Sequence, residues 1–174
     1  MHKYLLLLAL LLVVYPAELW ADGEDTYPNP NRLFHVERSK NKNLVCYDVN
    51  LTPSGTIDKD NPVKVYWINR EERMGERNGL SAIQQRLAYG YKTLAQATID
   101  NIEIALNATK DRKIKVIHHP QHGYICTITV NNQQVRLNKV FVKTKTPNSF
   151  SVEYVELVGE IIGSGLLVSE KIYK

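Results

Sequence analysis

The sequence contains few of the motifs that usually identify an enzyme or a nucleic-acid-binding protein. It has no phosphate-binding loop and no dinucleotide-binding glycine motif, since Gly163 and Gly165 fit a hairpin turn. Its 22 lysines and arginines only slightly exceed its 18 acidic residues and are spread along the chain. A nucleic-acid groove needs clustered cations interleaved with aromatic residues. These absences favour a protein that is not an enzyme, and we expect neither a cofactor nor a nucleic-acid partner.

Long apolar runs are also scarce. After residue 21 no segment is long and apolar enough to cross a bilayer, which takes about 20 residues. The main apolar run, residues 5–14, follows Lys3 and is ended by Pro16, and Ala21 supplies the small residue that a signal peptidase requires. We therefore expect residues 1–21 to be a signal peptide and not a membrane anchor. The protein would then be exported, either to the periplasm or as a secreted protein, with no membrane span after cleavage.

Cysteine is rare, with only Cys46 and Cys126 in the chain. Export to an oxidising compartment would allow them to form a disulfide. In residues 44–51, however, Val45 and Tyr47 share one face and Cys46 lies on the other, whereas Cys126 lies on the apolar face of its segment. A disulfide needs two Cβ atoms about 3.5–4.5 Å apart that point at each other. The strand phases therefore favour two buried or half-buried thiols, with a bridge as the alternative.

The chain does contain a series of short alternating segments, which predict β-strands. Asn131 and Asn132 fit a type I′ turn, because asparagine tolerates positive φ, and the alternation changes phase near Asn138, as it does at a β-bulge. There is no β-α-β alternation, so we expect a mainly β fold: an antiparallel sandwich or partly closed barrel of eight or nine strands with one short helix. This single domain would span residues 32–174, behind a flexible leader at residues 22–31. The expected strands are residues 33–38, 44–51, 63–68, 102–106, 113–117, 124–130, 135–142, 152–162 and 166–173.

One helix is expected, beginning at Ser81. Ser81 and Gln84 form a capping box, in which the serine oxygen accepts from the third helical amide and the glutamine reaches back. Ile83 and Leu87 have the spacing of one helical face and should pack on the sheet. Gly90 should end the helix in the left-handed region. Because two turns are not stable alone in water, we expect the burial of Leu87 to hold the helix in place.

Four segments of the chain form a recognisable set by their order and spacing. They are LFHVERSKNKN at residues 33–43, VCYD at 45–48, NPVKVYWI at 61–68 and IQQRLAYGY at 83–91. Together they resemble the family named domain of unknown function 4833, whose members are exported proteins seen often in Bacteroides-type bacteria. The resemblance covers nearly the whole chain after the signal peptide. It implies one domain and bacterial export, and it implies no activity, cofactor or catalytic residue.

Two groups of polar residues could carry chemistry. His118, His119 and His122 could hold zinc, but neighbouring strand residues point to opposite faces and at most two of the three rings converge. Glu37 and the glutamates of residues 71–76 could supply paired carboxylates, yet in that loop they alternate with arginines, as is typical of a solvated, self-neutralising loop. We therefore expect no metal and predict no catalytic residue.

Aromatic and arginine side chains near the helix are better candidates for a binding site. Trp, Tyr and Arg are enriched where proteins recognise partners. The alternative is ordinary core packing, in which Trp67 continues the inward phase of Val63 and Val65 and Tyr89 covers the sheet. The predicted binding residues are Arg38, Tyr66, Trp67, Arg86, Tyr89 and Tyr91.

Two functions follow from these observations. The first is a non-enzymatic envelope protein whose β scaffold binds another envelope protein, a glycan or a small apolar ligand. The second is a hydrolase of envelope material that uses an unrecognised carboxylate or histidine site, formed by Glu37, Arg38 or residues 118–122. A dry apolar cavity would favour the first function, and polar groups converging in one pocket would favour the second.

Overall fold

The structure is a computed structural model that describes residues 29–94, 98, 100–145 and 151–174. The expected signal peptide and residues 22–28 of the expected leader lie outside this part. The last residues of the leader, 29–31, are held against the sheet. Asn29 Nδ2 donates to the Asp48 carboxylate at 2.6 Å, and the Val49 amide donates to the Asn31 carbonyl at 2.8 Å.

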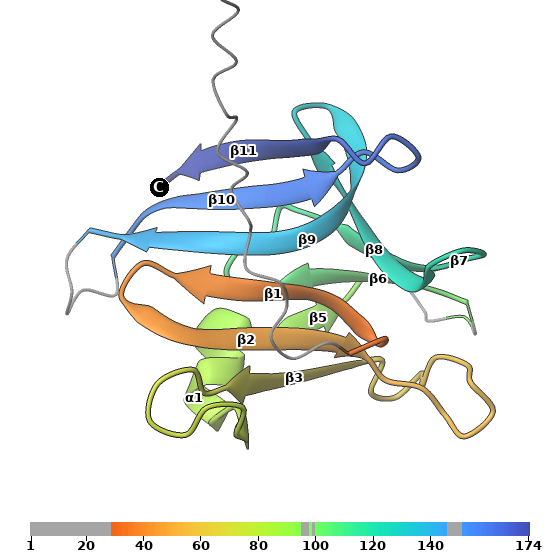
Figure 1. The fold of residues 1–174 in the computed structure, drawn as a ribbon, viewed down its shortest axis with the longest axis horizontal. Coiled ribbons are helices and arrows are strands. Elements are labelled where there is room, and N and C mark those ends of the chain that lie inside the picture. The colour runs from red at the N-terminus through yellow and green to blue at the C-terminus, as the bar shows by residue number, and fades with distance from the viewer. Residues whose placement is uncertain (1–28, 95–97, 99, 146–150) are drawn as a thin grey trace, which may run out of the picture.

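The described residues form one sheet of eleven strands, which curls into a half-barrel (Figure 1). The strand order is β4-β3-β2-β1-β9-β8-β7-β6-β5, and β10 pairs with β9 and β11. Figure 1 shows a front layer formed by β3, β2, β1, β9, β10 and β11. Behind it lie β8, β7, β6 and β5. The mainly β prediction with one short helix is confirmed, with the short β4 and β5 added. The strands are β1 (Arg32–Arg38), β2 (Asn41–Val49), β3 (Val63–Ile68), β4 (Arg77–Gly79), β5 (Tyr91–Thr93), β6 (Asn101–Leu106), β7 (Ile114–His119), β8 (Gly123–Val130), β9 (Gln133–Thr144), β10 (Val152–Glu160) and β11 (Leu167–Tyr173).

Alternation along the strands places apolar residues inside the curl. In β2, Val45 and Tyr47 belong to the main core, as expected. Cys46 points to the outer face, and Cys126 belongs to the main core. Both are buried free thiols, in agreement with the strand phases. On the outer face, Cys46 belongs to a small second hydrophobic cluster with Leu44, Ile68 and Tyr66.

The β8–β9 hairpin has the local features that the sequence predicts. Asn131 and Asn132 have φ of 47° and 64°, as a type I′ turn requires. The bulge is also confirmed, because the pairing of β9 with β10 passes from Leu137 to Lys139 and skips Asn138.

At this bulge β9 changes its neighbour. Residues 133–136 pair with β8, whereas residues 139–142 pair with β1 in parallel orientation. The predicted antiparallel arrangement holds for the other strand pairs, and β1 with β9 is a parallel exception. The physical reason is the length of β9. Its 12 residues extend beyond the part that pairs with β8, and β1 pairs with the rest of that edge.

The helical segment consists of α1 (Ala82–Gln84) and the π-helical η1 (Gln85–Tyr89). The capping box of Ser81 and Gln84 is confirmed. The prediction that Ile83 and Leu87 pack on the sheet is wrong, because these side chains are 69% and 64% exposed. In the π-form each hydrogen bond spans an extra residue, which turns the chain so that Tyr89 becomes the buried residue at its end.

Gly90 ends the helix in a different way from the one expected. Its φ is −70°, which is extended and not left-handed backbone. The need for glycine comes from close approach: a Cβ at this position would lie 2.0 Å from the Gln85 carbonyl oxygen, which accepts the Gly90 amide at 2.9 Å.

The two ends of the half-barrel are joined by a side chain. The Tyr91 hydroxyl, from β5, accepts a hydrogen bond from the Val63 amide at 3.2 Å and donates to the Val63 carbonyl at 3.1 Å. These backbone groups lie on the edge of β3 that faces away from β2. Tyr91 therefore closes the curl where no strand pairing does.

Across the described part of the chain, no helix has the length and apolar character needed to span a membrane.

Candidate functional site

A hollow of about 460 Å³ lies between the inner face of the sheet and the helical segment. Its size is within the range of small-molecule sites, and its walls are mainly apolar, as is usual for such sites. Ile83 and Leu87, the two exposed apolar residues of the helix, are part of this wall. The lining consists of Val36, Arg38, Asn41, Tyr47, Trp67, Ile83, Gln84, Leu87, Ala88, Tyr89, Leu106, Ala108, Thr109, Val140, Val142, Val152 and Val155.

The alternation of the front strands supplies the apolar wall. Val36 and Val140 are buried on the inner faces of β1 and β9, and Val155 is buried on β10. Tyr47 is fully buried and stacks on Phe34, with ring centroids 4.3 Å apart. The deep part of the hollow is therefore formed by side chains that packing holds in place.

An aromatic pair connects the helix to the sheet beside the hollow. The Trp67 and Tyr89 rings meet edge to face at 5.1 Å, and Trp67 Nε1 donates to the Gln84 side chain at 3.3 Å. The Tyr47 hydroxyl donates to the Tyr89 carbonyl at 2.7 Å. Burial raises the pKa of Tyr47, so this hydroxyl stays protonated and keeps the bond at physiological pH. Tyr89 is thus fixed through both its ring and its backbone.

Arg38 brings the one positive charge to this lining. It is the last residue of β1 and lies two positions beyond Val36 on the same inner face. Its Nη1 donates to the Tyr89 hydroxyl at 3.1 Å. No acidic side chain of the described residues forms an ion pair with it.

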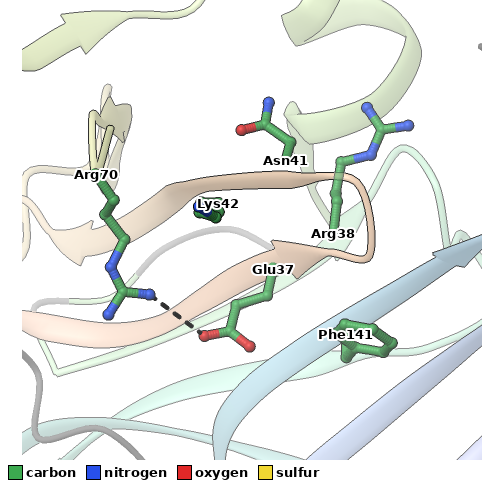
Figure 2. Close-up of a pocket in the computed structure, with 6 residues that line it drawn as sticks. All are labelled: Glu37, Arg38, Asn41, Lys42, Arg70 and Phe141. Atoms are coloured by element: carbon green, nitrogen blue, oxygen red, sulfur yellow. Dashed lines mark ion pairs between the residues drawn. The ribbon is translucent and has the colours of Figure 1, made fainter. Parts of the chain in front are cut away.

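A second hollow of about 320 Å³ lies around Glu37, where β1 meets the β1–β2 turn (Figure 2). It shares Arg38 and Asn41 with the apolar hollow. Glu37 precedes Arg38 in β1, so alternation turns its side chain to the outer face. The carboxylate lies 3.4 Å from His35 Nε2, 3.9 Å from Arg70 Nη1 and 3.5 Å from Lys139 Nζ. The hydrogen bond with His35, supported by the charge of Lys139, lowers the pKa of Glu37 despite its partial burial. A carboxylate that is ionised and neutralised in this way is poorly suited to act as a general acid.

Three of the six predicted binding residues come together. The three residues that line the apolar hollow are Arg38, Trp67 and Tyr89. Tyr89 contacts both of the others, because its hydroxyl accepts from Arg38 and its ring packs against Trp67. Arg86 and Tyr91 instead line a more polar hollow of about 490 Å³ between the helix and β3.

Tyr66 lies on the outer face of β3, away from the other five. Its hydroxyl donates to the Asp48 carboxylate, which also pairs with Arg32, and its ring lies 5.3 Å from the Arg77 guanidinium carbon. These contacts tie the start of β1 to β2 and β3, so Tyr66 has a structural explanation.

Residues 34–171 match the family described as domain of unknown function DUF4833. The chain belongs to this family. The matched range contains every residue that lines the apolar hollow, so the hollow belongs to the family domain. No curated protein and no solved structure matches the chain.

Sequence reasoning missed most of the hollow's lining. The spacing of Ile83 and Leu87 predicts a buried helical face, and alternation along the chain predicts the strands. These patterns identify apolar residues but do not show that a space remains between them. The available signal was the isolated Arg38, a cation on the inward phase of an apolar strand.

The three histidines considered for zinc, His118, His119 and His122, lie at the β7–β8 turn, away from Glu37. The β7–β8 turn that carries them and the β1–β2 turn beside Glu37 are on opposite sides of Figure 1. The His119 and His122 rings stack at 4.8 Å, and His118 packs edge to face on Tyr124 at 5.1 Å. No cluster of three or more His, Cys, Asp or Glu side chains that could hold a metal occurs among the residues described. Of the groups named for the hydrolase alternative, Glu37 and Arg38 line one hollow, and residues 118–122 lie apart from it.

Proposed function

We propose that this protein is a non-enzymatic, exported envelope protein that binds a small apolar ligand with an aliphatic chain in the hollow of its half-barrel. One observation carries the proposal: two large apolar side chains, Ile83 and Leu87, are about two-thirds exposed and form the lip of an apolar-walled hollow. Exposed apolar residues around a cavity mark a site where a ligand removes them from water.

The chemistry of the hollow supports binding more than catalysis. The polar groups of its lining are few, and none of the described carboxylates or histidines is among them. A glycan would need many hydrogen-bonding partners, which valine-rich walls do not offer. An aliphatic chain needs none, and each buried CH₂ contributes about 0.8 kcal/mol to its binding.

The experiment uses N-phenylnaphthylamine, a neutral apolar dye whose fluorescence rises in a dry site. The protein should bind it, and Leu87→Gln should weaken binding about tenfold, because the leucine side chain loses most of its contribution of roughly 1.5–3 kcal/mol. Leu166→Gln is a matched control, since Leu166 is 60% exposed but lies in the β10–β11 turn outside the hollow. Absence of dye binding, or equal binding by the Leu87→Gln variant, would contradict the proposal.

Export rests on the amino-terminal pattern. If it is correct, the exported protein should begin at Asp22, after Ala21. Amino-terminal sequencing tests this, and a chain that retains Met1 in the membrane fraction would contradict it.

A further inference from the structure

Arg38 is an unusual residue for the lip of an apolar hollow. A guanidinium is always charged and carries five N–H donors, of which the structure uses one, at the Tyr89 hydroxyl. Two other arginines of the described residues are neutralised by carboxylates: Arg32 in β1 pairs with Asp48, and Arg112 in the β6–β7 loop pairs with Glu170. Arg38 has no carboxylate partner among the described residues, so its remaining donors are available to a ligand.

The hydrogen bond from Arg38 also prepares Tyr89. Because the tyrosine oxygen accepts from Nη1 at 3.1 Å, its own proton is left to donate elsewhere. Tyr89 cannot easily turn away, since Trp67 packs on its ring and Tyr47 holds its carbonyl. The guanidinium and the hydroxyl together form a fixed pair of donors beside the apolar wall.

The register of the strands gives this donor pair a direction. Arg38 lies opposite Asn41, beside the β1–β2 turn, whereas Val36 and Tyr47 lie further along the sheet toward its buried centre. A ligand with its tail against Val36 and Tyr47 would therefore have its head at Arg38. Arginine binds carboxylate and phosphate oxygens in bidentate geometry, and such charge-assisted bonds are about twice as strong as neutral ones.

We infer that the hollow selects a single-chain amphiphile with an oxyanion head, a fatty carboxylate or an alkyl phosphate. The guanidinium of Arg38 and the hydroxyl of Tyr89 bind the head, and the apolar wall binds the tail. This inference rests on the proposed function, because it specifies the ligand of the same hollow.

The test compares heads on one tail. Decanoate, monodecyl phosphate, decanol and decyltrimethylammonium are each used to displace N-phenylnaphthylamine from the full chain. At least one of the two oxyanions should bind about 10- to 100-fold more tightly than decanol, and the cation should bind most weakly. The tighter of the two oxyanions identifies whether the natural head is a carboxylate or a phosphate.

Arg38→Gln should abolish the preference for oxyanions and leave decanol binding nearly unchanged. Tyr89→Phe should weaken only the oxyanions, by about threefold to tenfold, because one neutral hydrogen bond is lost. Arg86→Gln is the matched control. It removes the same charge from the same region, but Arg86 lines the more polar hollow between the helix and β3. If Arg38→Gln does not fold, Arg38→Lys keeps the charge without the bidentate fork and should retain part of the preference.

The outcomes separate the two proposals. If decanol binds as tightly as both oxyanions, or if Arg38→Gln and Arg86→Gln behave alike, the head-group inference is overturned and the apolar site stands. If the dye does not bind and none of the four amphiphiles binds, the proposed function is overturned together with it.

Discussion

Glu37 and Arg38 are neighbours in β1, and alternation points their side chains to opposite faces of the sheet. Arg38 reaches the inner hollow, whereas Glu37 lies on the outer face among His35, Arg70 and Lys139. The hydrogen bond from His35 and the charge of Lys139 lower the pKa of Glu37 in the folded protein. The carboxylate therefore stabilises the fold, and this contribution depends on pH.

We expect the Glu37 contribution to be fully present above the unfolded-state pKa of about 4.3 and to be lost as the pH falls through the lower folded-state value. Glu37→Gln should be less stable than the original protein at pH 7, and the difference should shrink below about pH 4. Urea unfolding between pH 7 and pH 3 measures it. Glu71→Gln is the control, because its ion pair with Lys42 is largely exposed. A difference that stays constant with pH would show that the interaction with His35 and Lys139 is not formed.

At the scale of elements, the short helix is held by its ends and not by its middle. Leu80, just before the Ser81 cap, is only 8% exposed, and Tyr89 at the other end is 6% exposed. Between them the capping box fixes the start, and the Asn107 side chain donates to the Gln85 carbonyl at 2.9 Å. This arrangement leaves Ile83 and Leu87 free to contribute to the hollow.

Leu80→Ala should therefore destabilise the protein by about 2 kcal/mol or more, as is usual for a leucine truncated in a core. Leu87→Ala should change the stability of the ligand-free protein by less than about 0.5 kcal/mol, as at most surface positions. Denaturant unfolding of both variants measures the contrast. Equal destabilisation would mean that Leu87 packs on the sheet after all, and that the hollow is smaller than described.

At the scale of the whole molecule, the half-barrel depends on contacts between segments far apart in the sequence. β1 joins β9 across a separation of about a hundred residues, and Tyr91 bridges β5 to the edge of β3. Burial raises the pKa of the Tyr91 hydroxyl, so it remains a neutral donor and acceptor in this position. The hollow exists because these contacts bring the two layers together without closing the space between them.

Tyr91→Phe should lower the unfolding free energy by about 1–3 kcal/mol, because it leaves the Val63 amide and carbonyl without partners. Hydrogen exchange at the Val63 amide should accelerate in parallel. Tyr173→Phe removes the same hydroxyl from a side chain that is 71% exposed and should have little effect. If the two variants are equally stable, Tyr91 does not close the half-barrel.

Part of this fold could be predicted because neighbouring residues encode it. The alternation of β2, the Asn131-Asn132 turn, the bulge at Asn138 and the Ser81 capping box all depend on residues a few positions apart. The preferences of these residues for a conformation are local, so the tertiary structure had little to add. Three residues that line the hollow, Arg38, Trp67 and Tyr89, are also among those that the sequence predicts from their chemical type to bind a ligand.

Only the tertiary structure decided how these pieces surround a space. The periodicity of the helix made Ile83 and Leu87 equally good as core residues or as the lip of a hollow, and the π-form resolved the choice through the burial of Tyr89. The parallel pairing of β1 with β9 likewise depends on a free edge that arises only after β8 and β9 have paired. The sequence by itself determined which residues are apolar and which way each strand turns them. The hollow and the place of Arg38 beside it depend on distances between segments that no local pattern records.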